Sequence, residues 1–515
     1  MDRRAFINDL ARYSALAATT PNIWRLRWHP NFADDPFQLG VASGDPTPSG
    51  AVLWTRLAPQ PADERGGMGD QRVVVRWEVA EDQSFTRITK SGRATATPEI
   101  AHSIHVDVDG LRPDSWYFYR FIAGDAVSDT GRLRTTPPDG AESPLRFAFA
   151  SCQHYEQGLY TSIEHLAAED IELGVHLGDY IYERGPSANA VRKHVGVAEV
   201  NSISDYRLRY GQYKSDPALR AMHARCPWVV IWDDHEVDNN YATLINEDTT
   251  MTLDTMRARR AAGYQAWWEH MPVRVSRARN WLDLKIYRST NWGRLARFWA
   301  VDDRQYRSDQ ACGDGSKAIP CGDWDSPKRA MLGSTQEKWL VDGLGRSNSR
   351  WQVLAQQVVF APPDEQPKAG DRVDMDKWSG YPAERDRILA AIAERARNRT
   401  VILTGDIHNN WVYDVRRGFD ATDRPIVAAE FVGTSLSSGG DGADTIARIN
   451  DAYLASHPSL KWANNRRGYV VCELNRDEWV AKYRTVDYVS RPGALVKTAA
   501  AWRTEHGRPG VTRIA

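Results

Sequence analysis

Four short apolar runs in this sequence are each followed by side chains that can bind a metal ion. Because the carboxyl ends of strands in an α/β sheet converge at one edge, we expect these side chains to lie together. Clustered carboxylates and imidazoles can hold two or more cations, whereas the carboxylates alone would repel one another. A single aspartate at a strand end often only caps a helix, so the hypothesis depends on all four runs. The metal-capable residues after the runs are Cys152, Asp179, Asp234 with His235, and Asp406 with His408.

The chemistry that such a cluster favours is attack of water on phosphorus. Two cations about 3.5–4 Å apart can bridge a phosphate, supply a hydroxide and neutralise the leaving oxygen. Beside the four motifs there is no Gly-x-Ser-x-Gly nucleophile elbow and no Walker-type Gly-x-x-x-x-Gly-Lys-Ser/Thr loop, which argues against acyl transfer and nucleotide-driven chemistry. The sequence therefore predicts direct hydrolysis of a phosphate ester by a metal-bound hydroxide, without a phospho-enzyme.

The elements that must position these residues belong to an α/β layered domain. After Pro144, apolar strand-like runs alternate with helical stretches, as is typical of packed sheet and helix layers. We expect this domain at 145–500, with a closing strand pair at 468–486 and a short tail at 501–515. The expected strands are 145–150, 173–178, 228–232, 297–301, 351–355 and 400–404, and the expected helices lie around 158–168, 334–345 and 382–397.

A small all-β domain is expected ahead of the layered domain, at residues 36–136. The stretches 73–79 and 116–120 are strand-like, and the alternating aromatics of the second resemble a late strand of a fibronectin- or immunoglobulin-like sandwich. The Pro- and Gly-containing stretch 136–144 predicts the linker between the two domains.

Composition and charge describe an ordinary globular chain with more than one domain. Its 515 residues are enough for two or three domains, and 66 Lys and Arg against 67 Asp and Glu leave a net charge of -1. This balance creates no field that would gather nucleic acid, so we expect no stable nucleic-acid partner. No stretch reaches the ~18 uninterrupted apolar residues of a membrane span.

Residues 1–35 are expected to be a leader. Arg3 and Arg4 are followed by two apolar residues, a pattern that resembles a twin-arginine export signal. Such a signal would make the twin-arginine machinery a partner and the periplasm or the extracellular space the destination. Polar residues interrupt the apolar segment that follows, so an ordinary amphipathic leader helix is the alternative.

The five cysteines divide by their surroundings. Cys312 and Cys321 lie in a Gly-rich loop, where a local disulfide suits an oxidising compartment and two free thiols are the alternative. Cys226 and Cys472 adjoin apolar runs and are expected to be inert core residues. Cys152 lies at a strand end beside the candidate metal site, so a ligand role is favoured over an inert buried thiol.

The motifs stand in a specific order along the chain. They are Ser151-Cys152, Gly178-Asp179-Tyr180-Ile181-Tyr182-Glu183, Trp232-Asp233-Asp234-His235-Glu236 with Asn239-Asn240, and Thr404-Gly405-Asp406-Ile407-His408. This order resembles the PhoD-like alkaline phosphatases, relatives of the calcineurin-like and purple acid metallophosphatases. The resemblance extends over most of the chain after Pro36, and a twin-arginine leader is typical of the family. The first and last motifs lack two histidines of the calcineurin-type pattern, which fits the PhoD-like branch.

The resemblance implies two kinds of metal site. A ferric ion would be held by the thiolate of Cys152, the phenolate of Tyr182, Asp179 and His408. Asp179 would bridge to a calcium site that includes Asp406 and Asp234. Anionic thiolate and phenolate suit a trivalent iron, and calcium prefers oxygen ligands. Zinc or manganese would also suit a Cys/Asp/His site, and a plain core aromatic is the alternative for Tyr182.

Further residues are candidates for contact with substrate. His235 is expected to act as the general acid for the leaving group, the alternative being a neutral imidazole that orients a carboxylate. Asn239 or Asn240 would bind calcium or a phosphate oxygen. Arg184 and Arg304 are candidates for binding phosphate, with a surface or structural ion pair as the alternative for each.

The expected activity is therefore metal-dependent hydrolysis of phosphate monoesters, of the kind that the resemblance to alkaline phosphatases implies, with a small phosphate ester as substrate. The first rival is a phosphodiesterase or phospholipase D-type hydrolase that acts on diesters with the same metals. The second is a non-enzymatic surface protein that binds calcium only structurally, although calcium alone has little use for Cys152 beside Tyr182.

Overall fold

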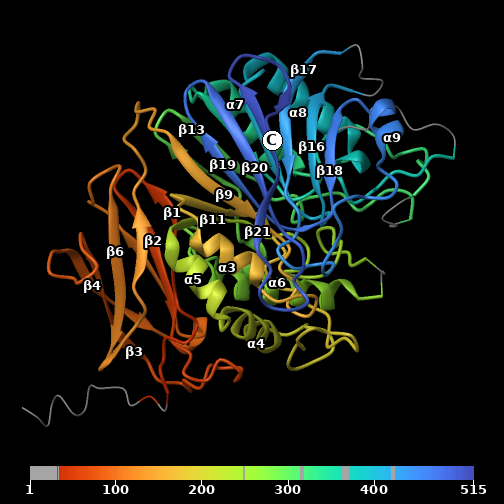
Figure 1. The fold of residues 1–515 in the computed structure, drawn as a ribbon. Helices are drawn as coiled ribbons and strands as arrows, with labels where there is room; N and C mark the ends of the chain where they lie inside the picture. The colour runs from red at the N-terminus through yellow and green to blue at the C-terminus, as the bar shows by residue number, and fades with distance from the viewer. Residues whose placement is uncertain (1–31, 33, 248–249, 314–317, 362–369, 419–423) are drawn as a thin grey trace, which may run out of the picture.

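Two β-sheets face each other across a shared apolar core, and helices cover the outer face of each sheet (Figure 1). The computed structural model describes residues 32, 34–247, 250–313, 318–361, 370–418 and 424–515. Phe147 and Phe298 come from opposite sheets and meet edge to face with ring centroids 5.3 Å apart. The sandwich of two sheets between helices confirms the expected α/β layered fold.

The first sheet has ten strands, with three parallel strands at its centre that lead into the candidate site. Helices α3 (Thr161–Ala168), α4 (Ile203–Lys214), α5 (Pro217–Arg225) and α6 (Leu253–His270) pack on it and on one another. The strand order is β22 (Val511–Arg513), β21 (Val496–Glu505), β20 (Glu478–Val486), β19 (Arg467–Leu474), β9 (Leu145–Ala150), β10 (Leu173–His176), β11 (Pro227–Val230), β1 (Val41–Thr47), β2 (Gly50–Arg56) and β5 (Ser103–Val108).

The second sheet has seven strands and buries both of its faces. Because side chains alternate along a strand, Phe298 joins the core between the sheets while Trp299 packs under α7 (Gly333–Arg346) and α8 (Pro382–Arg395). A short helix, α9 (Asp451–Ser456), precedes its edge strand. The strand order is β12 (Arg288–Trp292), β13 (Ala296–Ala300), β14 (Trp351–Ala355), β15 (Thr400–Thr404), β17 (Ile426–Val432), β16 (Asn410–Arg416) and β18 (Leu460–Asn464).

The N-terminal region is all-β, as expected, but it is not separate from the first sheet. Its own sheet contains β3 (Val73–Ala80), β4 (Ile88–Ala96), β6 (Trp116–Ala123), β7 (Ala126–Val127) and β8 (Gly131–Arg134), and it shares an apolar core with β1, β2 and β5. Burial alternates along β6, which buries Tyr117, Tyr119 and Phe121. Strand β1 then pairs in parallel with β11, Ser43 opposite Pro227, so backbone hydrogen bonds connect the region directly to the strand that precedes Asp234.

Strands form at all six runs that the sequence indicated, and β19 and β20 form the expected antiparallel closing pair. The expectation of a tail at 501–515 was wrong. Those residues lie in β21 and β22, which extend the ten-stranded sheet because β21 pairs with β20 over its full length.

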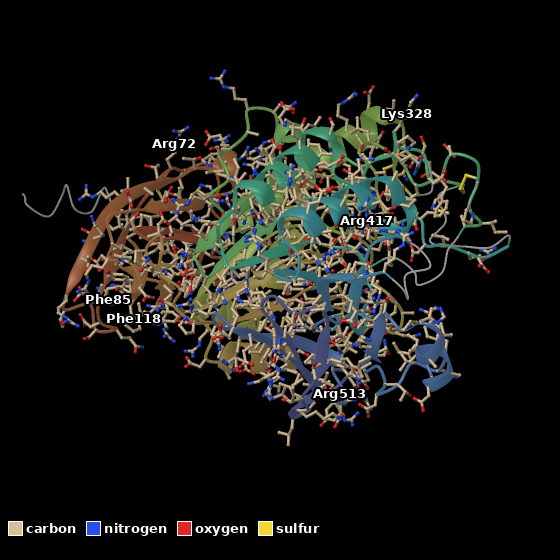
Figure 2. The ribbon with its side chains drawn as sticks, turned by 90° about the horizontal axis from the view of Figure 1, so that it is seen from above. Arg72, Phe85, Phe118, Lys328, Arg417 and Arg513 are labelled. Carbon is tan, nitrogen blue, oxygen red and sulfur yellow. A yellow bond between two sulfur atoms is a disulfide. The ribbon has the colours of Figure 1, made fainter. Side chains whose placement is uncertain are left out.

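The cysteines follow the sequence analysis. Cys312 and Cys321 form a disulfide with Cα atoms 5.6 Å apart, visible as a yellow bond on the side of the molecule away from Phe85 and Phe118 of the N-terminal region (Figure 2). Cys226 and Cys472 are free and buried. The expected leader contains Arg3 and Arg4, which lie outside the described residues. Within the described residues no helix has the length and apolarity to cross a membrane.

Candidate metal centre

The carboxyl ends of strands from both sheets meet at one place. Cys152 follows β9, Asp179 follows β10, Asp234 follows β11, and Asp406 follows β15 of the second sheet. Ser151 and Ser435 form an isolated parallel bridge between the segments that leave β9 and β17. The two sheets therefore converge where the sequence predicted the cluster.

The backbone is strained at this place. Five of the predicted site residues have left-handed conformations, which non-glycine residues rarely adopt. Each such residue costs on the order of 1–3 kcal/mol and persists only where the surroundings enforce it. The residues are Cys152 (φ 60°), Asp179 (φ 55°), Asn240 (φ 53°), Asp406 (φ 65°) and His408 (φ 55°). Strain concentrated on the candidate ligands supports a functional role for this geometry.

Two glycines allow the loops to approach so closely. At Gly178, where φ is 106°, a Cβ atom would lie 2.4 Å from the backbone nitrogen of Asp233. At Gly405 a Cβ atom would lie 2.5 Å from Oγ of Ser151. The glycine in each Gly-Asp motif thus brings the following aspartate next to a neighbouring strand end.

We call Cys152, Asp179, Tyr182 and His408 the thiolate half of the centre. Ligand atoms of Cys152, Asp179 and His408 all lie within 4.8 Å of one another. The Tyr182 hydroxyl donates to Oδ2 of Asp179 at 2.8 Å and lies 3.2 Å from Nε2 of His408. These four residues are therefore brought together as the sequence analysis expected.

Without a bound cation the thiolate half is poor in charge compensation. Burial raises the pKa of the Cys152 thiol and of the Tyr182 phenol well above their ordinary values, and the nearby Asp179 carboxylate adds to both shifts. Burial likewise raises the pKa of Asp179, whose Oδ1 is buried without a hydrogen-bond partner. A cation at this point would satisfy the orphaned oxygen and stabilise the anionic thiolate and phenolate, so the residues fit a metal ion.

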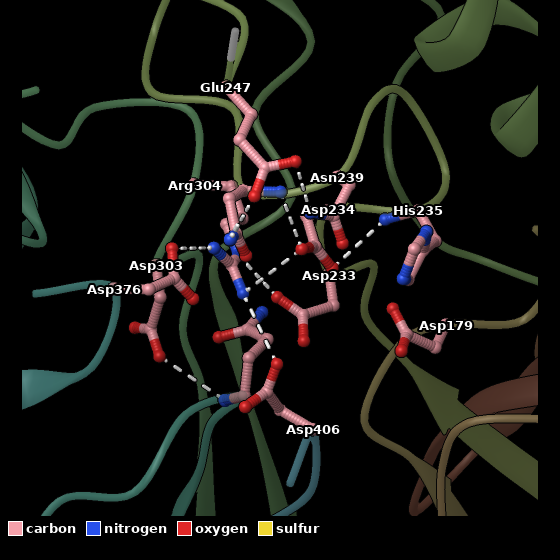
Figure 3. Close-up of polar contacts among 12 residues, drawn as sticks. Asp179, Asp233, Asp234, His235, Asn239, Glu247, Asp303, Arg304, Asp376 and Asp406 are labelled. Carbon is pink, nitrogen blue, oxygen red and sulfur yellow. Dashed lines mark hydrogen bonds and ion pairs between the residues drawn. The ribbon is translucent and has the colours of Figure 1, made fainter. Parts of the chain in front are cut away.

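The other side of the centre, which we call the carboxylate half, consists of Asp233, Asp234, Asp376 and Asp406. Figure 3 shows the Arg304 guanidinium among these carboxylates. Its Nη1 lies 2.8 Å from Asp376, and its Nη2 lies 3.6 Å from both Asp234 and Asp406. Oxygens of Asp233, Asp234 and Asp406 lie within 4.8 Å of one another, which gives a second oxygen-rich group able to hold a cation.

Arg304 lowers the pKa of two carboxylates of this half, whereas at Asp233 burial outweighs it and the pKa is raised. Burial alone would raise the pKa of Asp234, but Arg304 and His235 outweigh it and lower the pKa to about 2. Arg304 and Arg307 likewise lower the pKa of Asp376 against the effect of burial. Lys377 forms an ion pair with Asp406 and adds a further internal cation.

His235 is held by a carboxylate behind it. Its Nδ1 lies 2.7 Å from Oε2 of Glu183, whose Oε1 accepts the amide of Asn239 at 3.1 Å. Burial would lower the pKa of His235, but Glu183, Asp179 and Asp234 raise it well above its ordinary value. The ring packs on Tyr182 with centroids 4.1 Å apart. Because Nδ1 faces Glu183, Nε2 is left on the side of Asp179 (Figure 3).

The two predicted asparagines are oriented by a glutamate that the sequence analysis did not single out. The side-chain amides of Asn239 and Asn240 donate to the two oxygens of Glu247 at 2.7 and 3.0 Å. The backbone amide of Asn240 also donates to Asp234 at 2.8 Å. The side-chain amide nitrogens are thus engaged, and both residues line the central cavity.

Neither predicted arginine faces this cavity. The Arg184 side chain is 57% exposed, lies near Glu183 and Glu247, and is not among the residues that line the cavity. The side chain of its neighbour Glu183 points inward instead, toward His235. Arg304 is fully buried in ion pairs, so the alternative of a structural ion pair is correct for it.

A cavity of about 770 Å³ opens at the centre. Asp179, Asp234, Asp406 and His408 line one part of it, together with His235 and the two asparagines. Besides His235, its cationic lining residues within the described chain are Lys377, Arg372 and Arg448. Lys377 also contacts the candidate ligand Asp406.

Comparison with known families identifies the family of proteins to which this chain belongs. The family model of the PhoD-like phosphatases matches residues 147–483, and the model of their N-terminal domain matches residues 23–137. The chain belongs to the PhoD-like phosphatase family. It is a phosphoric ester hydrolase, and the alternative of a non-enzymatic calcium-binding protein is wrong.

Individual relatives agree with this assignment. Alkaline phosphatase D of Bacillus subtilis (strain 168) is 44% identical over 525 residues, which cover 100% of this chain and 89% of the relative. A solved structure of PhoD superposes with a TM-score of 0.91 at 46% identity, covering 94% of this chain and 93% of that chain. The purple acid phosphatase PPD1 from yellow lupin (Lupinus luteus) seeds, at 14% identity, covers 90% of this chain and 73% of its own with a TM-score of 0.54, and it shares the fold.

Several residues of this PhoD-like phosphatase site escaped the sequence analysis. The buried Glu236 carboxylate accepts the amides of Asp179, Tyr180 and Asp233 at 3.1, 2.7 and 2.9 Å, and so ties two motif loops together. Its position inside the third motif was a usable signal. Asp376 and Lys377 precede a single-turn helix rather than following a strand, so the strand-end pattern could not find them.

Proposed function

We propose that this PhoD-like phosphatase hydrolyses phosphate monoesters with a pair of metal sites that share Asp179. The observation that carries the proposal is the position of this carboxylate. Asp179 belongs to a group with Cys152 and His408 and to a second group with Asp234 and His235. Its buried Oδ1 has no hydrogen-bond partner, as expected of an oxygen that binds a metal.

The donor sets of the two halves favour different metals. A thiol, a phenol, a carboxylate and an imidazole suit ferric iron in the thiolate half, whereas carboxylates and amide oxygens suit calcium in the carboxylate half. Zinc or manganese in the thiolate half is the alternative, which metal analysis separates. Such cations, when bound, polarise a water molecule for in-line attack and neutralise charge on the phosphoryl oxygens.

The protein's own groups then bind and orient the ester. Asn239 and Asn240, held through Glu247, present amide groups to a calcium ion or a phosphate oxygen. Lys377 takes the role first expected of Arg184, because its ammonium lies at the cavity beside Asp406. His235, oriented and kept protonated by Glu183, donates a proton to the leaving oxygen.

The test combines metal removal with substitution. Chelation should abolish hydrolysis of p-nitrophenyl phosphate, and iron with calcium should restore it. The Asp179→Ala/Asp406→Ala double variant should be inactive even with metals, while circular dichroism shows that it remains folded. Metal content measured by mass spectrometry should fall in parallel. Full turnover in the double variant would overturn the proposal.

Replacing His235 tests whether this residue acts as the general acid or as a metal ligand. His235→Asn should keep the metal content and lose kcat, with the larger loss for esters whose leaving alcohol is more basic. If the variant instead loses a metal and treats all leaving groups alike, His235 is a ligand.

Hydrolysis of diesters is the second candidate, because the cavity of about 770 Å³ is far larger than a phosphate group requires. Comparison of bis-p-nitrophenyl phosphate with p-nitrophenyl phosphate decides between the two. A higher kcat/KM for the diester would make phosphodiesterase the main activity. Export by the twin-arginine route to the periplasm or the outside stays a prediction, and fusing residues 1–35 to a reporter tests it.

A further inference from the structure

Beyond the metal centre, the cavity has a wall made of rings. We call Trp411, Tyr413, Tyr453 and His457 the ring wall; all four line the cavity. The first two lie on β16, Tyr453 lies on α9, and His457 follows that helix. None of the four was a candidate in the sequence analysis, and none belongs to either half of the centre.

The ring wall continues directly from the catalytic loop. Ile407, His408, Asn409 and Trp411 line the cavity in succession, so the wall begins next to a candidate metal ligand. Trp411 and Tyr413 are two positions apart on a strand and share one face, while Val412 between them is buried on the other. A substituent that extends from a phosphate at the centre along this side of the cavity would therefore meet these rings.

The rings contact one another in pairs, which restrains them before a ligand binds. Tyr453 and His457 are stacked with centroids 3.8 Å apart and an interplanar angle of 7°, and Nδ1 of His457 lies 2.9 Å from the Tyr453 carbonyl oxygen. Tyr413 pairs across the sheet with Leu460, which also lines the cavity. Trp411 and Tyr413 are arranged edge to face, 5.9 Å apart. Preorganised rings lose little conformational entropy when a ligand binds.

Water attack on phosphorus needs none of these rings. Tyr453 nevertheless keeps 36% of its surface exposed inside the cavity wall, and cavities of roughly 300–1,000 Å³ normally enclose an organic ligand. Exposed Arg448 also lines the cavity.

We propose that the ring wall is a specificity subsite for a flat ring in the alcohol portion of the phosphate ester. Aromatic faces stack on planar rings and contact little of a flexible chain. The inference rests on the proposed function, because the ester's phosphorus must lie at the metal centre for its alcohol portion to reach Trp411.

Binding of phosphonates tests the subsite without turnover. Calorimetry with the metal-loaded protein compares benzylphosphonate, cyclohexylmethylphosphonate and methylphosphonate, which share the anion and differ in the ring. Benzylphosphonate should bind about tenfold more tightly than the other two. Trp411→Leu and Tyr453→Leu should each remove most of this preference and leave methylphosphonate binding unchanged, whereas Trp411→Phe should keep it.

Trp462→Leu is the matched control, because Trp462 is a half-buried tryptophan on the neighbouring strand β18 and does not line the cavity. This variant should keep the ring preference. Equal loss in Trp411→Leu and Trp462→Leu, or equal affinity of the wild-type protein for all three phosphonates, would overturn the subsite. Failure of the proposed function looks different, since the wild-type protein would then bind no phosphonate in a metal-dependent way.

Discussion

The two halves of the metal centre handle buried charge in opposite ways. In the carboxylate half, Arg304 lies among four aspartates and Lys377 pairs with Asp406. In the thiolate half, the anion-forming groups of Cys152 and Tyr182 have raised pKa values, with burial as the main cause. The carboxylates of one half are paired directly with internal cations. Asp179 in the other half forms no ion pair within the described residues and has His235 and Arg467 near its half, so that half gains more from a cation from outside.

This difference predicts how tightly each half should hold a metal. A thiolate and a phenolate that ionise only when a cation arrives gain strongly from a trivalent ion. Carboxylates already paired with a guanidinium and an ammonium gain less from a further cation. We therefore expect a chelator to empty the carboxylate half first, and the following changes test the two halves separately.

The largest effect should come from Asp179, the residue that both halves share. Asp179→Asn keeps the size of the side chain and removes its charge. Activity should fall at least on the order of a thousandfold, because even one lost transition-state donor costs about 100- to 1,000-fold. Metal analysis should show losses in both halves. Loss of one metal with the other retained would show that Asp179 does not bridge.

Arg304→Gln should break the carboxylate half alone. Removing one partner from a buried ion-pair group costs about 3–5 kcal/mol of the free energy of unfolding, measurable by urea denaturation of the metal-free protein. Saturating calcium should recover part of this loss, because a cation can replace the guanidinium charge. Arg304→Lys, which keeps the charge, is the control and should lose less. Unchanged stability in Arg304→Gln would contradict the charge-compensation argument.

The sequence was sufficient to predict the positions of the candidate ligands that follow buried strands. Apolar runs predicted the strands, and Cys152, Asp179, Asp234 and Asp406 at their ends predicted where the cluster forms. This works because parallel strands bring their carboxyl ends to one edge whatever the loops do. The same rule missed Lys377, since its loop belongs to no strand of either sheet.

The direction and burial of individual side chains could not be predicted from the sequence in the same way. Arg184 follows the second motif directly, yet Glu183 points inward and Arg184 outward. Arg304 is fully buried, a rare environment for arginine that depends on four aspartates from distant segments. The ring wall brings β16 together with α9, and neither its composition nor its spacing distinguishes it from ordinary core in the sequence.

Glu183 lies between the halves, and its replacement should have a moderate effect. Glu183→Gln keeps the contacts to His235 and Asn239 but removes the charge that holds His235 protonated. Loss of a supporting partner of this kind costs about 10- to 100-fold, here in kcat. Because the pKa of His235 falls, the alkaline limb of the pH profile should move to lower pH. A profile that only drops in height would mean that Glu183 acts on position alone.

The smallest effect concerns Lys214, a buried ammonium behind the thiolate half. Its Nζ lies 4.2 Å from the Trp54 ring and 5.3 Å from the ring of Tyr180, the neighbour of Asp179. No carboxylate forms an ion pair with it within the described residues, in contrast to Arg304. Burial lowers the pKa of Lys214 from 10.5 to about 7.

The sign of the resulting pH dependence follows from this shift. Between pH 7 and 10.5 the unfolded chain keeps the Lys214 proton and the folded chain releases it, so stability rises with pH, by about 1.4 kcal/mol per pH unit. Subtracting the urea-denaturation curve of Lys214→Met from that of the wild-type protein between pH 7 and 9 isolates this slope. Lys338→Met, at a lysine whose side chain is 77% exposed, should leave the slope in place. A difference curve that stays flat would mean that Lys214 remains charged, and that the protein tolerates an unpaired cation behind the thiolate half.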